Sequence, residues 1–214
     1  MPKKKSIDKT TARRAYGLTI LKAAHPHLRQ LKRHYEPSIH GNKFWSSSYL
    51  LMDFLGCQGL PLGTRVMEVG CGWGLAGIFC AKQFGARVIG VDADPNVFPY
   101  LELHARLNGV EVQTRQARFE ELGERELAGQ DVVVAADVCF WDEMVDPLYT
   151  LIEKAVQAGV QQVVMADPGR PPFEQVCARC VERLGGQTKE WNVEGNSATA
   201  SGTLLLIGSL PAKK

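Results

Sequence analysis

The sequence predicts an α/β protein: a doubly wound, seven-stranded sheet, mostly parallel with an antiparallel last strand, plus an N-terminal helical extension. From residue 64 onward, short apolar segments alternate with helical patterns, as the strands and crossover helices of a parallel sheet do. Within this region an apolar run at residues 66–69 ends in alternating glycines that lead directly into an apolar helical pattern. We therefore expect one globular unit at residues 64–214, with residues 1–63 packing on it as a basic arm and helices.

The expected elements follow this alternation along the chain. A helix is expected at residues 47–55, because serines suited to the N-cap precede it and apolar side chains recur at helical spacing. Residues 11–35 alternate apolar and basic side chains, which predicts one or two helices broken near Pro26, and residues 1–10 are expected to be disordered. The remaining helices are expected at 75–84, 95–108, 142–158 and 171–184, and the strands at 64–69, 86–92, 110–115, 131–137, 161–167, 187–193 and 203–210.

Composition argues against membrane-spanning and disulfide-stapled classes of protein. The chain has 214 residues, 45% hydrophobic and 22% charged, as an ordinary globular domain does. No apolar run approaches the roughly 18 residues of a membrane span, and no apolar core follows the first lysines, so a cytoplasmic protein is expected. The six cysteines fall within predicted elements or the glycine turn. Cys177 and Cys180 form a single C-x-x-C without a second pair, which favours packing over a metal site.

Charge is distributed unevenly along the chain. The whole chain has a net charge of +2, yet its first 35 residues contain ten lysines and arginines and one acid, Asp8. Such a basic arm can be a solvated tail, a docking surface for an acidic protein, or a nucleic-acid contact. The sequence leaves these three alternatives open.

The glycine turn predicts a cofactor cradle, because glycines let backbone N–H groups and a helix N-terminus approach a ligand closely. A dinucleotide fingerprint would require a third glycine at position 75, where this chain has Leu75. The chain instead reads Glu68-x-Gly70-x-Gly72-x-Gly74. A carboxylate at position 68 is unfavourable beside a pyrophosphate and favourable beside a cationic ligand such as S-adenosylmethionine, which has an ammonium and a sulfonium but no phosphate.

A second acid supports this interpretation. Asp92 ends the next expected strand, 18 residues after Gly74, where a carboxylate would accept hydrogen bonds from two ribose hydroxyls. Together the two motifs resemble those of class I, seven-β-strand, Rossmann-like methyltransferases, over residues 64–210. This resemblance implies S-adenosyl-L-methionine as cofactor. It also implies a set of cofactor-binding residues, namely Trp45, Glu68, Gly70, Cys71, Gly72, Gly74, Asp92, Ala93 and Asp137.

The acceptor site is expected after the fourth strand of the core, since ligands of open α/β sheets bind at the carboxyl ends of strands. Asp137-Val138-Cys139-Phe140 places an acid before an aromatic cluster. The carboxylate could orient an amine while the rings desolvate it and face the positive charge that develops on methylation. In the structural alternative, Asp137 caps the next helix and Phe140 is part of the core.

The residues after this strand also resemble the D-x-x-Y/F motif of protein-lysine methyltransferases of this class. Asp-Pro-Gly-Arg at 167–170 is similar to the branch that includes the electron-transfer flavoprotein β-subunit lysine methyltransferase and bacterial relatives, some labelled nicotinamide N-methylase. The resemblance implies that Asp137 and Phe140 are catalytic and that Trp45, near the mouth of an acceptor channel, contacts substrate. Arg170 could hold a substrate carboxylate or Asp137, or could stand at the surface.

The acceptor is thus expected to be a lysine side chain in a protein, with a small-molecule amine as the alternative. A nucleic-acid substrate is disfavoured, because amino-methylating nucleic-acid enzymes of this class have an N/D-P-P-Y/F turn at the position of Asp137. Cys139 lacks the Pro-Cys context of a cytosine C5 nucleophile. The adenine amino group has no obvious acid at 116–120, which leaves a backbone contact near Arg118 or Phe119, or Glu120. The sequence does not indicate an oligomeric state.

Overall fold

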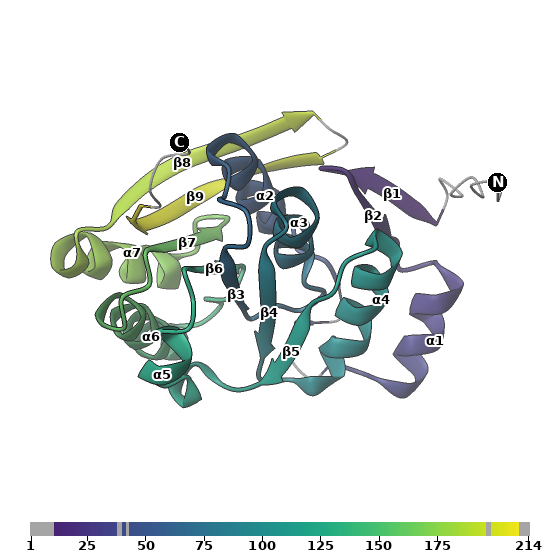
Figure 1. Cartoon of the computed structure of the whole chain (residues 1–214), viewed down its shortest axis with the longest axis horizontal. Coiled ribbons are helices and arrows are strands. Elements are labelled where there is room, and N and C mark those ends of the chain that lie inside the picture. Colours follow the sequence, from purple (N-terminus) through teal and green to yellow (C-terminus); the bar gives the residue numbers. More distant parts are fainter. Residues whose placement is uncertain (1–10, 38–39, 42, 196–197, 210–214) are drawn as a thin grey trace.

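A computed structural model describes residues 11–37, 40–41, 43–195 and 198–209, so the disorder predicted for residues 1–10 lies outside the described residues. Its centre is a seven-stranded sheet in the order β5-β4-β3-β6-β7-β9-β8 (Figure 1). The strands from β5 to β7 run parallel, and β9 is antiparallel to both of its neighbours, which confirms the predicted fold class. The strands are β3 (Arg65–Val69), β4 (Arg87–Asp92), β5 (Gln113–Gln116), β6 (Val132–Ala136), β7 (Gln162–Asp167), β8 (Gln187–Gly195) and β9 (Ala198–Gly208).

Helices cover both faces of the sheet and bury two separate hydrophobic cores. The side chains of a strand alternate between faces, so Val66 of β3 joins the core under α2 and α3, and Met67 joins the core under α6 and α7. The first face carries α2 (Ser47–Gln58), α3 (Leu75–Phe84) and α4 (Phe98–Asn108), and the second carries α5 (Glu124–Leu127), α6 (Val145–Gln157) and α7 (Pro171–Leu184). Short 3₁₀ turns are η1 (Pro95–Val97), η2 (Phe119–Glu121) and η3 (Asp142–Met144).

The N-terminal segment departs from the prediction. Residues 12–21, expected to be helical, form an antiparallel hairpin of β1 (Ala12–Ala15) and β2 (Leu18–Leu21), and only α1 (Pro26–His34) is a helix. The hairpin turns at Tyr16 and Gly17, whose φ angles of 51° and 73° are those of a type I′ turn. The spacing of apolar residues suggested a helix, but this turn and the buried β2 strand produce a hairpin.

Side chains of α4 hold this hairpin, which lies beside α4 in Figure 1. Asn108 Oδ1 accepts from the Thr19 backbone N–H at 2.8 Å, and His104 Nε2 accepts from the Leu21 N–H at 3.2 Å. His104 is completely buried, and burial lowers the pKa of its imidazole to about 4. The ring is therefore neutral, with the proton on Nδ1, which donates to the Tyr100 carbonyl. A two-stranded hairpin is marginally stable by itself, and these contacts with α4 stabilise it.

Other element boundaries shift by a few residues. The strand expected at 110–115 is Gln113–Gln116, and the strand expected at 203–210 is Ala198–Gly208, lengthened by pairing with β8. Helix α2 continues to Gln58. The core on the α2 side combines residues of the 1–63 segment, such as Leu18 and Leu50, with residues of the sheet. Among the described residues, no helix has the length and apolarity that a membrane crossing requires.

The strand order reverses between β3 and β6, because β4 and β5 extend the sheet on one side of β3 while β6 and β7 extend it on the other. At such a switch point the loops after two neighbouring parallel strands diverge and leave a crevice at their carboxyl ends. The glycine turn after β3, the end of β4 at Asp92 and the loop after β6 at Asp137 all meet there.

Candidate active site

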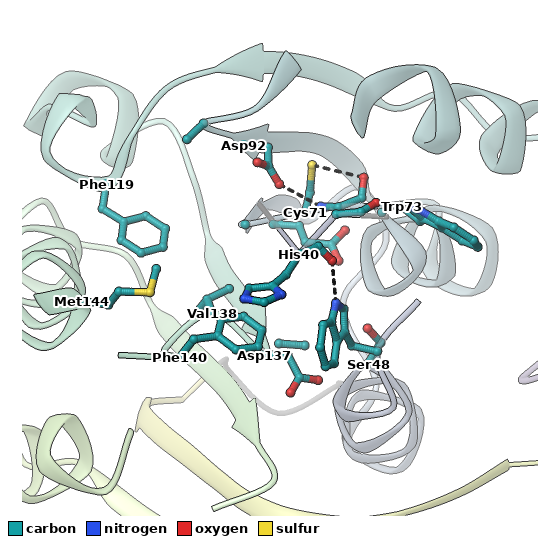
Figure 2. A pocket seen from close by; sticks show the side chains of 18 of the residues that line it. His40, Ser48, Cys71, Trp73, Asp92, Phe119, Asp137, Val138, Phe140 and Met144 are labelled. Carbon is teal, nitrogen blue, oxygen red and sulfur yellow. Dashed lines mark hydrogen bonds between the residues drawn. The ribbon is translucent and has the colours of Figure 1, made fainter. Parts of the chain in front are cut away.

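A cavity of about 290 Å³ lies at this switch point, and Figure 2 shows side chains that line it. Asp92 and Asp137 stand on opposite sides of the view, with His40 and Phe140 on the Asp137 side and Phe119 and Met144 along another wall. Gly70, Gly72 and Gly74 of the glycine turn also line the cavity. The lining comes from the glycine turn, the ends of β4 and β6, the loop after β5 and the segment before α2, which are separated by up to about a hundred residues in sequence.

The glycine turn is shaped by its conformation and by close packing. Gly70, Gly72 and Gly74 have φ angles of 61°, 50° and 68°, in the left-handed region that favours glycine. A Cβ on Gly70 would lie 2.5 Å from Val138, and a Cβ on Gly74 would lie 2.5 Å from Leu101. The absence of a side chain at these two positions therefore allows close packing with Val138 and Leu101. A Cβ on Gly72 would meet nothing within 4 Å, and Gly72 lines the cavity. Gly72 is therefore the glycine that leaves room for a ligand.

Glu68 supports this turn from beneath. Its residue is 3% exposed, and its Oε2 accepts from the backbone N–H of Gly77 at 2.9 Å, in the first turn of α3. Gly74, the N-cap of α3, has no side chain to do this, so Glu68 supplies an acceptor for the N-terminus of the helix. Burial raises the pKa of the Glu68 carboxyl to about 7, opposed by hydrogen bonds from Gly77 and Ala76.

The raised pKa of Glu68 predicts a pH dependence of folding stability. Because the folded-state pKa lies above the unfolded value of 4.5, the folded protein retains a proton that the unfolded chain has released. The stabilisation is fully present below pH 4.5 and is lost as pH rises through about 7. The difference amounts to about 3 kcal/mol at 1.36 kcal/mol per pKa unit.

The variant Glu68→Gln keeps an acceptor for Gly77. Its free energy of unfolding, relative to that of wild type, should be higher at pH 8 than at pH 5. Urea unfolding at both pH values measures this double difference. The exposed Glu121, which accepts from the Arg118 N–H, provides a matched control. Glu121→Gln should retain the pH dependence of wild type, and an equal change in both variants would contradict the assignment to Glu68.

The carboxylate of Asp92 ends β4 at the rim of the same turn. Its Oδ2 accepts from the Gly72 N–H at 2.9 Å, and its Oδ1 accepts from the Asp94 N–H at 3.0 Å. Each carboxylate oxygen has a second lone pair that can accept from a ligand hydroxyl. Asp92 therefore both orients the glycine turn and presents acceptors to the cavity, which Cys71 and Ala93 also line.

The far wall of the cavity is the region where the sequence left the adenine contact open. Ala117, Arg118, Phe119 and Glu120 all line it, together with side chains from the start of α6 and the turn before it, Met144 and Pro147. Phe119 and Met144 face each other across the cavity wall in Figure 2. Phe119, Met144 and Pro147 give this wall apolar side chains that a purine ring could contact.

Asp137 follows β6 in an unusual backbone conformation. Its φ of 57° is one of two positive values among the described non-glycine residues, and such a conformation costs about 1 kcal/mol or more. Three contacts hold it there. Asp137 N–H donates to the Ala166 carbonyl at 3.0 Å, Oδ2 accepts from the Ser47 N–H at 3.1 Å, and Oδ1 accepts from Arg170 Nη2 at 2.8 Å.

The sequence analysis allowed Asp137 to cap the helix that follows it, but the structure shows that Asp137 caps a different helix, α2. The carboxylate accepts from the first residue of α2, 90 residues earlier in the chain, and not from the helix that follows it. Ser46, the N-cap of α2, makes no side-chain capping bond, so Asp137 satisfies the helix terminus in its place. Asp137 remains part of the cavity wall while it makes these bonds.

Aromatic rings surround the Asp137 end of the cavity. Phe140 stacks on His40 with ring centroids 4.3 Å apart and meets the edge of Trp45 at 5.2 Å. Trp45 Nε1 donates to the His40 carbonyl at 2.8 Å. Both Phe140 and Trp45 line the cavity, as the sequence prediction required, and His40 and Ser48 complete this wall.

Arg170 does not line the cavity. Its guanidinium bridges Asp137 and Asp167, with the Nη1 to Asp167 Oδ2 distance at 2.5 Å, and lies 4.2 Å from the Phe140 ring centroid. Of the alternatives that the sequence left open, this geometry matches the one in which Arg170 holds Asp137. The arginine supports both the acid and an aromatic ring of the wall from behind.

Two residues of the site, His40 and Trp73, were not among those predicted from the sequence. His40 precedes the expected helix in an irregular segment, and Trp73 stands between two glycines of the turn. Trp73 is buried, stacks on Tyr100 and His104, and donates from Nε1 to the Gly41 carbonyl at 3.0 Å, so it anchors the segment that carries His40. The aromatic composition of residues 40–45 was the available hint.

The remaining cysteines lie away from this chemistry. Cys139 is completely buried, and burial raises the pKa of its thiol to about 11. Cys177 and Cys180 pack in the core under α6 and α7, and burial raises the pKa of each to about 12. Such protonated thiols behave as small hydrophobic side chains.

Comparison with known proteins shows which proteins this chain resembles. Residues 66–159 match the family model of a methyltransferase domain. The ubiquinone biosynthesis O-methyltransferase of Hahella chejuensis is 35% identical over 89 residues, which are 42% of this chain and 37% of that protein. The electron transfer flavoprotein beta subunit lysine methyltransferase of Xenopus laevis is 28% identical over 131 residues, which are 61% of this chain and 52% of that protein.

Solved structures share the fold. The Pyrococcus abyssi tRNA (uracil-54, C5)-methyltransferase, in complex with S-adenosyl-L-homocysteine, has a TM-score of 0.57 at 17% identity, covering 91% of this chain and 42% of that chain. This chain spans about half or less of the length of the curated relatives named above. Residues 66–159 thus resemble a methyltransferase domain, and the fold of the chain is that of class I, S-adenosylmethionine-dependent methyltransferases.

The cavity fits the cofactor of that class. Gly72 leaves open space at the turn, and Asp92 presents a carboxylate at the end of β4. Leu75 stands where a dinucleotide fingerprint would have its third glycine. Glu68 lines the cavity beneath the turn, and a cationic ligand beside it would favour its ionised form.

Proposed function

We propose that this protein transfers the methyl group of S-adenosylmethionine to an amine, and that the amine is the side chain of a lysine in a protein. The observation that carries the proposal is the arrangement at one end of the cavity, where Asp137 stands beside Phe140 and Trp45. An acid within an aromatic enclosure matches a group that is polar before the reaction and cationic after it. The similarity to a lysine methyltransferase of Xenopus laevis supports the same acceptor.

On the cofactor side, we propose that Asp92 accepts from the ribose hydroxyls and that Gly70, Gly72 and Gly74 carry the backbone along the amino-acid portion. Cys71 and Ala93 would form part of the cavity wall, and the positive charge of the cofactor would favour the ionised form of Glu68. When bound, S-adenosylmethionine supplies an electrophilic methyl group on a sulfonium sulfur. The protein therefore has to align the two reactants and exclude water, and it needs no strong base.

On the acceptor side, the amine nitrogen has to arrive neutral with its lone pair directed at the methyl carbon. Desolvation by Phe140, Trp45 and His40 favours the neutral form, and the proton leaves to water before transfer. A carboxylate can accept about four hydrogen bonds, and Asp137 accepts one on each oxygen, so capacity remains for a substrate N–H. The nitrogen–carbon bond forms as the carbon–sulfur bond breaks, and the aromatic rings face the resulting cation.

A small-molecule acceptor is the second candidate. It is favoured by the similarity to a ubiquinone biosynthesis O-methyltransferase of Hahella chejuensis, at higher identity over a shorter stretch. The aromatic wall would enclose a flat small molecule as well as a lysine stem. We propose no nucleic-acid acceptor, since the loop after β6 lacks the proline pair described above.

Radiolabelled S-adenosylmethionine, incubated with the protein and a lysate of its source cells, distinguishes the two candidates. A labelled band on a denaturing gel, with methyl-lysine in its acid hydrolysate, would support a protein-lysine acceptor. Label only in the small-molecule fraction would support the alternative. Incubation with heat-denatured protein is the control, and label in neither fraction above this control would contradict methyl transfer.

A further inference from the structure

A second, open groove adjoins Trp45, which also lines the cofactor cavity. Arg13 of β1 and the segment before α2, with Lys43 and Phe44, form its walls, and Tyr49 of α2 also lines it. Ala198 and Thr199, at the start of β9, also line the groove. Trp45 is therefore a partition shared by the cofactor cavity and this groove.

Two polar groups at this groove are unsatisfied. Among the described residues, the hydroxyl of Tyr49 and the Nε of Arg13 are buried and have no hydrogen-bond partner. Tyr49 as a residue is 3% exposed. A buried polar group without a partner costs about 1–3 kcal/mol, and folded proteins leave few of them. Two such groups in one groove indicate a ligand that accepts hydrogen bonds.

The charges at the groove have one sign. The Arg13 guanidinium lies 4.8 Å from the Phe44 ring centroid, and Lys43 Nζ lies 3.8 Å from the Trp45 ring centroid. No acidic side chain is among the described residues that line the groove. Asp53, one turn beyond Tyr49 on α2, already accepts from Tyr16 and Trp191.

The Tyr49 hydroxyl is a donor under ordinary conditions. Burial raises the pKa of Tyr49, partly offset by the nearby positive charge of Arg13, so the hydroxyl keeps its proton. The residues that line the groove thus include a guanidinium, an ammonium and a hydroxyl, all hydrogen-bond donors, and a planar carboxylate is the side chain that matches a guanidinium best.

We propose that this groove binds an acidic side chain of the acceptor protein, through Arg13, Lys43 and Tyr49. The inference rests on the proposed function, because it names the substrate class of the same site. Lysine would enter on the cavity side of Trp45 while the acidic side chain binds on the groove side. The acceptor lysine thus has an aspartate or glutamate close to it on the substrate surface.

The test measures binding without methyl transfer. The probe is a short synthetic peptide with one lysine flanked by glutamates, compared with its counterpart in which glutamine replaces every glutamate. Fluorescence titration with the full chain, loaded with S-adenosylhomocysteine, measures the dissociation constants. The glutamate peptide should bind about tenfold more tightly than the glutamine peptide, as expected for charge-assisted hydrogen bonds.

Variants of the groove locate the effect. Arg13→Gln should weaken binding of the glutamate peptide about tenfold, and Tyr49→Phe about fivefold, since each removes a donor. Arg14 follows Arg13 on β1, where alternate side chains face opposite ways, and it is exposed. Arg14→Gln removes the same charge and should leave binding within about twofold of wild type.

Tyr49→Phe has a readout of its own. Removing a hydroxyl without a partner should leave the melting temperature at or above that of wild type. A clear loss of stability would mean that the hydroxyl is satisfied within the protein, and would overturn the inference. Equal binding of the two peptides, or equal weakening by Arg13→Gln and Arg14→Gln, would overturn it as well.

Failure of the proposed function gives a different pattern. Suppose that the glutamate peptide binds selectively but no methylated protein appears in the lysate experiment. The groove would then still be a site for acidic peptides, and the proposed lysine methyltransferase activity would be contradicted. If methylated lysine appears in the lysate but the two peptides bind equally, the proposed activity would be supported and the proposed role of the groove would be contradicted.

Discussion

Replacing Asp137 by asparagine is expected to lower the turnover of methyl transfer about 10²-fold, equivalent to about 2.7 kcal/mol. A carboxylate directed at a nitrogen that becomes positive stabilises the transition state more than the ground state, and a neutral amide does so much less. Affinity for S-adenosylhomocysteine should change by less than about threefold, because Asp137 and Asp92 lie on opposite sides of the cavity. Isothermal calorimetry and single-turnover rates measure the two quantities.

Folding stability has to be measured alongside, because Asp137 also has structural contacts. Its side chain is 2% exposed and pairs with Arg170, and removing one partner of a buried pair can cost about 3–5 kcal/mol. Asparagine retains an acceptor for Ser47 and limits that loss. An Asp137→Asn variant that folds normally and methylates at the wild-type rate would refute the role, and would move the positioning of the acceptor to Trp45.

Asp167 supplies a matched control for this experiment. It is the other carboxylate that holds Arg170 and is completely buried, but it does not line the cavity. Asp167→Asn should lose comparable stability and keep turnover within about threefold of wild type. If both variants lost turnover equally, the cluster around Arg170 would have a structural role alone.

Replacing Asp92 by alanine is expected to weaken binding of S-adenosylmethionine and S-adenosylhomocysteine at least tenfold, equivalent to about 1.4 kcal/mol or more. The substitution removes charged acceptors from the cavity and also frees the Gly72 N–H that Asp92 orients. Calorimetric titration of both ligands measures the effect. The melting temperature should rise less with ligand than in wild type, since a ligand that binds the folded state stabilises it in proportion to its affinity.

Asp94 controls for damage to the same loop. It is buried, accepts from the Asn96 N–H at 2.9 Å, and lies outside the cavity lining. Asp94→Asn should bind both ligands with nearly wild-type affinity. Unchanged binding in Asp92→Ala, or tight binding of NAD in wild type with no response to S-adenosylmethionine, would contradict the cofactor assignment.

The parts of this site that the sequence predicted are those whose signals are local. The strand, the glycine turn and the helix at residues 65–84 follow one another in a continuous stretch of sequence. Asp92 and Asp137 stand at strand ends that the periodicity of apolar residues identifies by itself. In a parallel sheet those ends gather at one edge, so their approach to a shared cavity follows from the fold class. Trp45 and Phe140 were placed by resemblance, and both line the cavity.

The partners of these residues could not be predicted in the same way. Glu68 was interpreted as a group for a cationic ligand, and the structure shows it also accepting from α3 at Gly77, which requires the helix to fold back over its strand. The hairpin at residues 12–21 resembled a helix by spacing, because its stabilising contacts come from His104 and Asn108, more than eighty residues away in sequence.

By itself, then, the sequence determined the order of the strands and helices from residue 64 onward and the class of cofactor site, because hydrophobic period, glycine spacing and acids at strand ends are properties of neighbouring residues. The tertiary structure alone decided that Asp137 accepts from Ser47 and Arg170, that His40 stacks on Phe140, and that the Tyr49 hydroxyl and the Arg13 Nε have no hydrogen-bond partner. Each of these depends on distances between segments far apart in the chain, which packing of the whole core sets and no local pattern encodes.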